Sequence, residues 1–210
     1  MRTITYEEIK NTVAELCIKS CNHLGEDVFQ KLKFSVHTEK SPVGVDILKQ
    51  LVKNALIAAA DEIPICQDCG LAVVFAEVGQ GVHIEGSFID AVNDGVIQGY
   101  ADGYLRKSTC TVLTRENYGN NTPAILHTKL VPGENIKLTV APKGGGAENM
   151  SALKMFPPAA GRAGIIDFVV ETVRQAGPNP CPPIVLGIGL GGNFEMAPLL
   201  AKEALLLEIG

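Results

Sequence analysis

The sequence has no tryptophan, and aromatic residues make up only 5% of its 210 residues. Proteins that stack nucleic-acid bases need exposed aromatic rings, so no stacking platform is expected. An excess of basic residues is also missing, because 18 lysines and arginines stand against 23 aspartates and glutamates, for a net charge of −5. Without a basic footprint, nucleic acid is not an expected partner.

Long apolar runs are absent as well. No stretch approaches the roughly 20 apolar residues that a membrane helix needs, so a membrane is not an expected partner. The N-terminus, MRTITYEEIKNTVAEL, lacks the apolar core and small-residue cleavage site of a signal peptide. We therefore expect a cytoplasmic protein. In a reducing compartment its six cysteines should pack, bind metal or react rather than form disulfides.

What the sequence does contain is typical of a globular protein rich in specialised loops. Apolar residues make up 46%, which is enough to bury a core. Charged residues make up only 20%, which argues against a disordered chain. The length allows one large domain or two small ones at about 100–200 residues each. The 22 glycines and 12 prolines indicate many tight turns.

Residues 1–62 predict a mostly helical segment. Thr5 and Glu8 have the spacing of a capping box, and Ser41-Pro42 is a favourable start for a second long helix. A shorter amphipathic stretch, residues 28–34, lies between them. Cys17 and Cys21 are one helical turn apart on the apolar face, which favours packing over a metal pair.

Residues 63–210 mix both element types. Strands are expected at residues 71–78, 124–131, 136–140 and 182–186, with residues 82–85 as a hairpin partner of the first across Gly79-Gln80-Gly81. Helices are expected at residues 87–100, 163–175 and from about 194 to the end. Strands and helices do not alternate regularly, so the fold class is α+β, or irregular α/β. We expect one continuous domain of N-terminal helices and a mixed, glycine-loop-rich part.

Gly187, Gly189 and Gly192 satisfy the G-x-G-x-x-G pattern of dinucleotide-binding loops. That fingerprint also needs an acidic residue about 20 positions further on, and the sequence ends first. A nicotinamide site is therefore the weaker reading. The simpler one is that these glycines let two backbones, or a backbone and a ligand, approach closely.

Cys66 and Cys69 form a C-x-x-C pair with three possible roles. A redox motif would need a thioredoxin-like βαβ context, which is missing. A zinc site would need two more ligands, and the candidates, Cys110 and Cys181, are isolated in the sequence. An iron–sulfur cluster can gather single thiolates from distant loops. Cys181, held between prolines, suits that last role, while a zinc or interaction module of all four cysteines remains the alternative.

Asp68 stands beside these ligand candidates. A carboxylate next to a Lewis-acidic metal centre can serve as a general base. The alternative is an N-cap or turn aspartate, which is common in such loops.

Six short motifs occur together in one order: Ile65-Cys66-Gln67-Asp68, Leu105-Arg106, Asn121-Thr122-Pro123-Ala124, Lys143-Gly144-Gly145-Gly146, Asn179-Pro180-Cys181-Pro182-Pro183 and Gly187-Ile188-Gly189-Leu190-Gly191-Gly192. Together they resemble the α part of the iron–sulfur hydro-lyases, namely class I fumarase and the tartrate dehydratase α subunit. The resemblance spans nearly the whole chain. It implies a [4Fe-4S] cluster held by three cysteines, with one iron open as a Lewis acid. The implied reaction is the reversible removal of water from a small dicarboxylate such as malate or tartrate.

The resemblance also implies roles for individual residues. Cys66 and Cys181 match two of the three cluster ligands. Gln67 and Asp68 match substrate contacts, with Asp68 as the candidate base. The remaining substrate-binding candidates are Arg106, which matches a carboxylate clamp, and the backbone at Gly145 and Gly146. A planar guanidinium suits a carboxylate, since it can bond both oxygens.

Two departures stand out. The family usually has threonine at the position of Cys69, so Cys69 is not expected to be a ligand. The third cysteine lies in a C-terminal segment outside this sequence, which stops at Gly210 within an apolar helical pattern. We therefore expect an incomplete site. The resemblance implies completion by a β subunit or C-terminal domain, in a homodimer of α parts or an α2β2 assembly.

Overall fold

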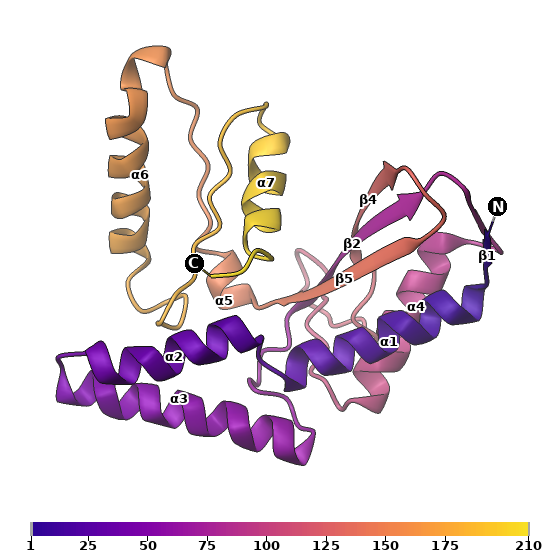
Figure 1. The fold of residues 1–210 in the computed structure, drawn as a ribbon, viewed down its shortest axis with the longest axis horizontal. Helices are drawn as coiled ribbons and strands as arrows, with labels where there is room; N and C mark the ends of the chain where they lie inside the picture. The colour runs from indigo at the N-terminus through magenta and orange to yellow at the C-terminus, as the bar shows by residue number, and fades with distance from the viewer. Residues whose placement is uncertain (1, 210) are drawn as a thin grey trace. The chain divides into compact units, whose positions relative to one another are not determined.

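The computed structural model in Figure 1 describes residues 2–209. The chain forms two compact units. The first runs to Lys143 and also includes Ile209, and the second covers residues 144–208. Helices and small sheets are both present, which confirms the α+β class. The expected subdivision at residue 62 stays a prediction.

Four helices dominate the first unit: α1 (Tyr6–Asn22), α2 (Glu26–Thr38), α3 (Pro42–Asp61) and α4 (Phe88–Asp102). The capping residues expected from the sequence start α1 and α3. The Glu8 backbone N–H donates to Thr5 Oγ1 (3.2 Å) and the Thr5 N–H donates to Glu8 Oε2 (2.7 Å), a complete capping box. Ser41 caps α3 and Ser87 caps α4 by a single bond each, in which the serine side-chain oxygen accepts a backbone N–H of the first turn.

The main sheet of this unit has three strands in the order β4-β2-β5. The central strand β2 (Leu71–Gly79) pairs parallel with β4 (Ile125–Val131) and antiparallel with β5 (Ile136–Lys143). Its burial pattern is almost continuous, as expected for a strand covered on both faces. A second sheet joins β1 (Arg2–Ile4) to β3 (Val82–Ile84) in parallel.

The hairpin expected between β2 and residues 82–85 is wrong. Both edges of β2 are occupied along most of their length by β4 and β5, so no edge is left for β3. The backbone after β2 instead bonds the β4–β5 turn, where Gln80 N–H donates to Val131 O (2.9 Å) and Gly81 N–H donates to Gly133 O (2.8 Å). β3 then pairs with β1, which the sequence did not predict.

The core of the first unit lies between α1, α4 and one face of the sheet, and Figure 1 shows α1 and α4 running side by side. Two glycines on α4 allow this close packing. A Cβ at Gly95 would lie 2.6 Å from the Lys10 carbonyl oxygen, and one at Gly99 would lie 2.6 Å from the Ala14 carbonyl oxygen. Any side chain there would push the two helices apart.

The second unit contains the short helix α5 (Gly145–Glu148), a 3₁₀ turn at residues 158–160, α6 (Gly161–Ala176) and α7 (Met196–Ala204). The strand expected at residues 182–186 is wrong, because these residues form no ladder. The last helix also ends at Ala204 rather than continuing to the end of its apolar pattern.

The glycine run beyond residue 186 packs against α7. A Cβ at Gly187 or Gly189 would lie 2.0 and 2.1 Å from the carbonyl oxygens of Ala201 and Ala197, respectively. These glycines therefore serve close backbone contact, the simpler of the two sequence readings. The strand–loop–helix context that a dinucleotide fingerprint requires is not formed here.

None of the helices within residues 2–209 is both long enough and apolar enough to cross a membrane.

The α1–α4 packing gives the first prediction. Gly99→Val places two methyl groups against backbone atoms of α1, and we expect it to lower the free energy of unfolding by about 2 kcal/mol. Ala101→Val, on the exposed side of the same helix, adds comparable bulk without a neighbour and serves as the control. Urea denaturation followed by circular dichroism measures both. Equal losses in the two variants would show that the helices do not depend on this close approach.

Candidate active site

The loop between α3 and β2 carries Cys66, Gln67 and Asp68. Its start is anchored on two helices, because Ile65 N–H donates to the Cys21 carbonyl at the end of α1 (2.9 Å) and Asn54 Nδ2 on α3 donates to the Ile65 carbonyl (2.8 Å). Its end is anchored by burial of Cys69 and Gly70. The residues between these anchors are exposed or half-buried, so a rigid loop presents them outward.

Cys66 is an exposed thiol with polar groups directed at its sulfur. The Asp68 backbone N–H donates to Cys66 Sγ at 3.4 Å, and the Cys66 thiol donates to Gln67 Oε1 at 3.3 Å. A backbone N–H directed at sulfur stabilises a thiolate and is one of the interactions that tune iron–sulfur ligands. The environment of Cys66 is therefore suited to metal ligation.

The Asp68 carboxylate has one neighbour in its own turn and one on a second loop. Its Oδ1 accepts a hydrogen bond from Gly70 N–H (3.2 Å), the turn interaction that the sequence allowed. The same oxygen lies 4.0 Å from Nη1 of Arg106, which belongs to the loop after α4. Asp68 is half-buried and Arg106 is largely exposed, so the pair faces solvent, where an anionic ligand can reach the guanidinium.

Arg106 is held at its backbone rather than at its side chain. Leu105 before it is buried, and Arg106 N–H donates to Cys69 Sγ at 3.3 Å. The Cys69 thiol in turn lies 3.7 Å from the Cys66 carbonyl oxygen, as a donor to it. Cys69 thus joins the two loops from inside, a structural role that the C-x-x-C spacing did not reveal.

Two further residues support the site, and the sequence did not predict this role for them. The Tyr100 hydroxyl donates to the carbonyls of Cys69 (2.9 Å) and Gly70 (3.2 Å), and Asn121 Nδ2 donates to the Gly70 carbonyl (3.2 Å). Asn121 stands in one of the six motifs, which was the available signal. Tyr100 is an ordinary apolar-face position in its helix, and nothing in the pattern marked it.

In the second unit, Cys181 and the glycine loop form another local arrangement. Cys181 has a positive φ of 59° and donates its N–H to Pro178 O (3.1 Å), so it sits in a tight turn with its thiol exposed. The Cβ position of Gly146 lies 3.2 Å from the Asn179 carbonyl oxygen, which places this turn beside the glycine loop. The Cβ position of Gly145 meets no atom within 4 Å.

The glycine loop is braced from α7. Lys202 Nζ lies 2.6 and 2.5 Å from the two carboxylate oxygens of Glu148, at the end of α5. This ion pair fixes the short helix that Gly145 and Gly146 begin.

The structure therefore assembles the expected residues in two groups. The first unit brings together Cys66, Gln67, Asp68 and Arg106, and the second brings together Gly145, Gly146 and Cys181. Among residues 2–209, no group of three or more histidine, cysteine or acidic side chains is arranged to hold a metal ion.

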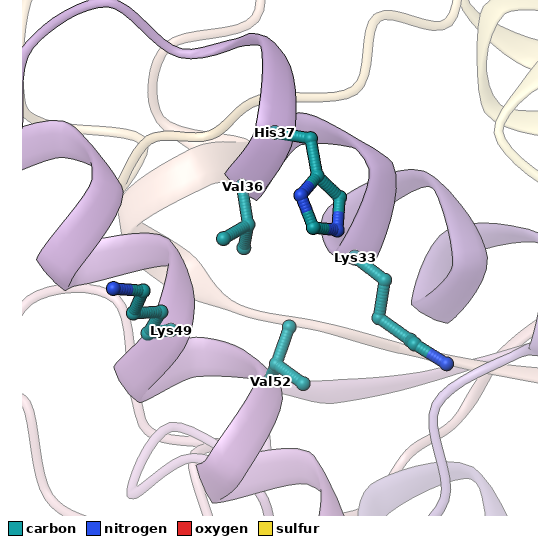
Figure 2. A pocket seen from close by; sticks show the side chains of 5 residues that line it. All are labelled: Lys33, Val36, His37, Lys49 and Val52. Atoms are coloured by element: carbon teal, nitrogen blue, oxygen red, sulfur yellow. The ribbon is translucent and has the colours of Figure 1, made fainter.

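A hollow between α2 and α3 is a different feature from this site. Figure 2 shows its lining side chains, which are Lys33, Val36, His37, Lys49 and Val52. None of them is a predicted site residue, and no carboxylate or thiol faces the hollow.

The thiols of Cys17 and Cys21 are buried, whereas that of Cys66 is exposed. Burial raises the pKa of Cys17 and of Cys21 to about 12, so both stay protonated at neutral pH. Both pack in the core beside Cys69, which confirms the packing role expected for the i, i+4 pair.

This difference gives the second prediction. At pH 8 and without metal, iodoacetamide should modify Cys66 in the folded protein within minutes, while Cys17 and Cys21 react only after denaturation, because thiolates are the reactive form. Peptide mass spectrometry before and after adding guanidinium measures this order. In Cys66→Ser the early label on that peptide should disappear. Labelling of Cys17 at the rate of Cys66 would contradict the burial seen here.

Comparison with known proteins defines the class of the chain. The family model for fumarate hydratase (Fumerase) matches residues 10–210, so the chain belongs to the fumarate hydratase family. Enzymes of this family are hydro-lyases, which add water to a carbon–carbon double bond or remove it.

Individual relatives refine the comparison. A protein of Methanocaldococcus jannaschii, provisionally named L(+)-tartrate dehydratase subunit alpha, is 39% identical over 97% of this chain and 74% of its own length. The L(+)-tartrate dehydratase subunit alpha of Escherichia coli strain UTI89 is 27% identical over 97% of this chain and 68% of its own length. The protein of that name from strain K12 is 26% identical over the same shares.

Proposed function

We propose that this chain is the α part of a [4Fe-4S]-dependent hydro-lyase that adds water to, or removes it from, a small dicarboxylate. The observation that carries the proposal is the placement of Asp68 and Arg106. They come from two separate loops, lie 4.0 Å apart and stand next to the exposed thiol of Cys66. A carboxylate clamp, a proton-transfer group and a metal ligand then share one surface.

Arg106 supplies the cation that a dicarboxylate needs. Its guanidinium is mostly solvent-exposed and lies 4.0 Å from the Asp68 carboxylate. A substrate carboxylate can accept two parallel hydrogen bonds from it, which fixes both position and orientation. Gln67, exposed on the facing loop, can bond the substrate hydroxyl or a second carboxylate oxygen.

Asp68 is the group that we assign to proton transfer. Removing water from a 2-hydroxy diacid requires loss of a proton from the carbon next to the hydroxyl-bearing carbon. A carboxylate positioned within reach of that carbon contributes about 10²–10⁴-fold to such a step. The Gly70 N–H bond and the nearby Arg106 hold the Asp68 carboxylate in place for it.

Cys66 and Cys181 are the residues that would hold the cluster. Both thiols are exposed, both sit on constrained loops, and Cys66 Sγ already accepts a backbone hydrogen bond. Cys17, Cys21 and Cys69 are buried and belong to the core. When bound, an iron–sulfur cluster with an open iron supplies Lewis-acid polarisation of the leaving hydroxyl.

The names of the relatives extend the proposal to substrate and partner. Because they are alpha subunits of L(+)-tartrate dehydratases, tartrate is the first substrate to assay, followed by malate and fumarate. An alpha subunit implies a β subunit, and we propose one as the partner of this chain, in an α2β2 assembly or with homodimeric α parts.

The third prediction tests the carboxylate clamp. Arg106→Lys keeps the charge and loses the two-pronged geometry, so we expect KM for the dicarboxylate to rise about tenfold or more. Arg115→Lys changes another exposed arginine of the same loop and serves as the control. Steady-state hydration kinetics of the anaerobically reconstituted complex with the β partner measure both. An unchanged KM in Arg106→Lys would remove the clamp from the proposal.

The fourth prediction tests Asp68. Asp68→Asn keeps the oxygen that accepts the Gly70 N–H, so folding should be preserved while the basic group is lost. We expect kcat to fall by about 100-fold or more with a much smaller change in KM. Asp102→Asn, at the exposed end of α4, is the control. A kcat within threefold of the wild type would exclude Asp68 as the proton-transfer group.

A further inference from the structure

Asn121 is a polar residue placed where polar residues are rarely found. Its side chain is fully buried, and its backbone has a positive φ of 61°. A left-handed conformation is costly for most residues and is best tolerated by glycine and asparagine. Asparagine suits this backbone conformation, and its buried amide also needs hydrogen-bond partners.

The carbonyl end of the Asn121 amide holds the loop that carries Arg106. Asn121 Oδ1 accepts hydrogen bonds from Ser108 N–H (2.6 Å), Thr109 N–H (3.1 Å) and Thr109 Oγ1 (3.3 Å). These donors begin two residues after Arg106. They therefore fix the backbone that directly follows Arg106.

The amino end of the same amide holds the other loop. Asn121 Nδ2 donates to the Gly70 carbonyl at 3.2 Å, two residues after Asp68. The same residue, Gly70, donates its N–H to Asp68 Oδ1. One buried amide thus connects the backbone beside Asp68 to the backbone beside Arg106.

An amide side chain of this size can bond both loops at once. It offers a donor at one end and an acceptor at the other, whereas a carboxylate offers acceptors only and an aliphatic side chain offers neither. Replacement by glycine removes the acceptor of the Ser108 and Thr109 N–H groups and leaves the Gly70 carbonyl with the Tyr100 hydroxyl alone, so the direct connection between the two loops is lost.

We propose that Asn121 is a positioning residue that sets the Asp68–Arg106 geometry by binding both loops through its amide. Its catalytic meaning rests on the function proposed above. The residue does not touch substrate; it acts through Arg106 and Asp68. Misplacing a binding group by about 1 Å can cost about 100-fold in rate, so the effect should be large.

The first test is a double-mutant cycle in the reconstituted complex. Asn121→Gly tolerates the positive φ and removes both bonds, so it should lower kcat/KM by about 30-fold or more in the wild type. In the Arg106→Lys background, where the clamp is already lost and only the Asp68 loop can still be misplaced, the same change should cost about tenfold or less. A purely structural residue would cost the same factor in both backgrounds, and that result would overturn the proposal.

Asn93→Asp is the matched control for Asn121→Asp. Each asparagine accepts a backbone N–H through Oδ1 and donates to a carbonyl through Nδ2, but Asn93 is half-buried and bonds Ala124 N–H and Ile89 O rather than the backbone next to Asp68 or Arg106. Asn121→Asp should lower kcat/KM by about tenfold or more because its carboxylate repels the Gly70 carbonyl. Asn93→Asp should stay within threefold of the wild type. Equal losses in the two variants would count against positioning.

Hydrogen exchange of the full chain tests the coupling without turnover. In Asn121→Gly, peptides covering residues 65–71 and 105–110 should both exchange at least about tenfold faster, with α1 unchanged. In Asn121→Asp, residues 65–71 should respond more strongly, since the acceptor for Ser108 and Thr109 remains. Unchanged exchange in either loop of Asn121→Gly would overturn the proposal. A wild-type complex that turns over no dicarboxylate would overturn the proposed function alone, and the exchange result would still decide the positioning claim.

Discussion

The hydroxyl of Tyr100, buried in the core at the end of α4, bonds the carbonyls of Cys69 and Gly70 and so ties the helical core to the candidate site. Burial raises the pKa of Tyr100 well above its usual value, so the hydroxyl remains a donor at any working pH. Its position depends on the close approach of α1 and α4, which Gly99 permits. The position of the loop that carries Cys66 therefore depends on the packing of α1 against α4.

From this anchor the site is built outward by backbone bonds rather than by side-chain ion pairs. Cys69 Sγ accepts the Arg106 N–H, and Asn121 joins the two loops beneath the exposed surface. The functional side chains can then stay exposed, where a ligand can reach them. The cysteines likewise fall into a buried and an exposed group. Cys17 and Cys21 pack in the core, while Cys66 and Cys181 face solvent.

Local signals predicted much of the fold. Thr5 with Glu8, and Ser41 with Pro42, started helices where the sequence indicated. The pairing of β3 with β1 joins residues about 80 positions apart in three-residue strands, and no local pattern encodes such a contact. Residues 182–186 had the composition of a strand without a partner strand in the structure. For the site, the six motifs marked Asp68 and Arg106, whereas the supporting Tyr100 depends on tertiary contacts that no motif contains.

The most direct test of the central claim is the electron paramagnetic resonance spectrum of the reduced, anaerobically reconstituted complex with its β partner, recorded with and without tartrate. If Arg106 orients a dicarboxylate toward the open iron of a cluster that Cys66 helps to hold, tartrate should change the spectrum of the wild type and leave that of Arg106→Lys nearly unchanged at the same concentration. An identical tartrate-induced change in both proteins would contradict the account, because the ligand would then reach the cluster without Arg106.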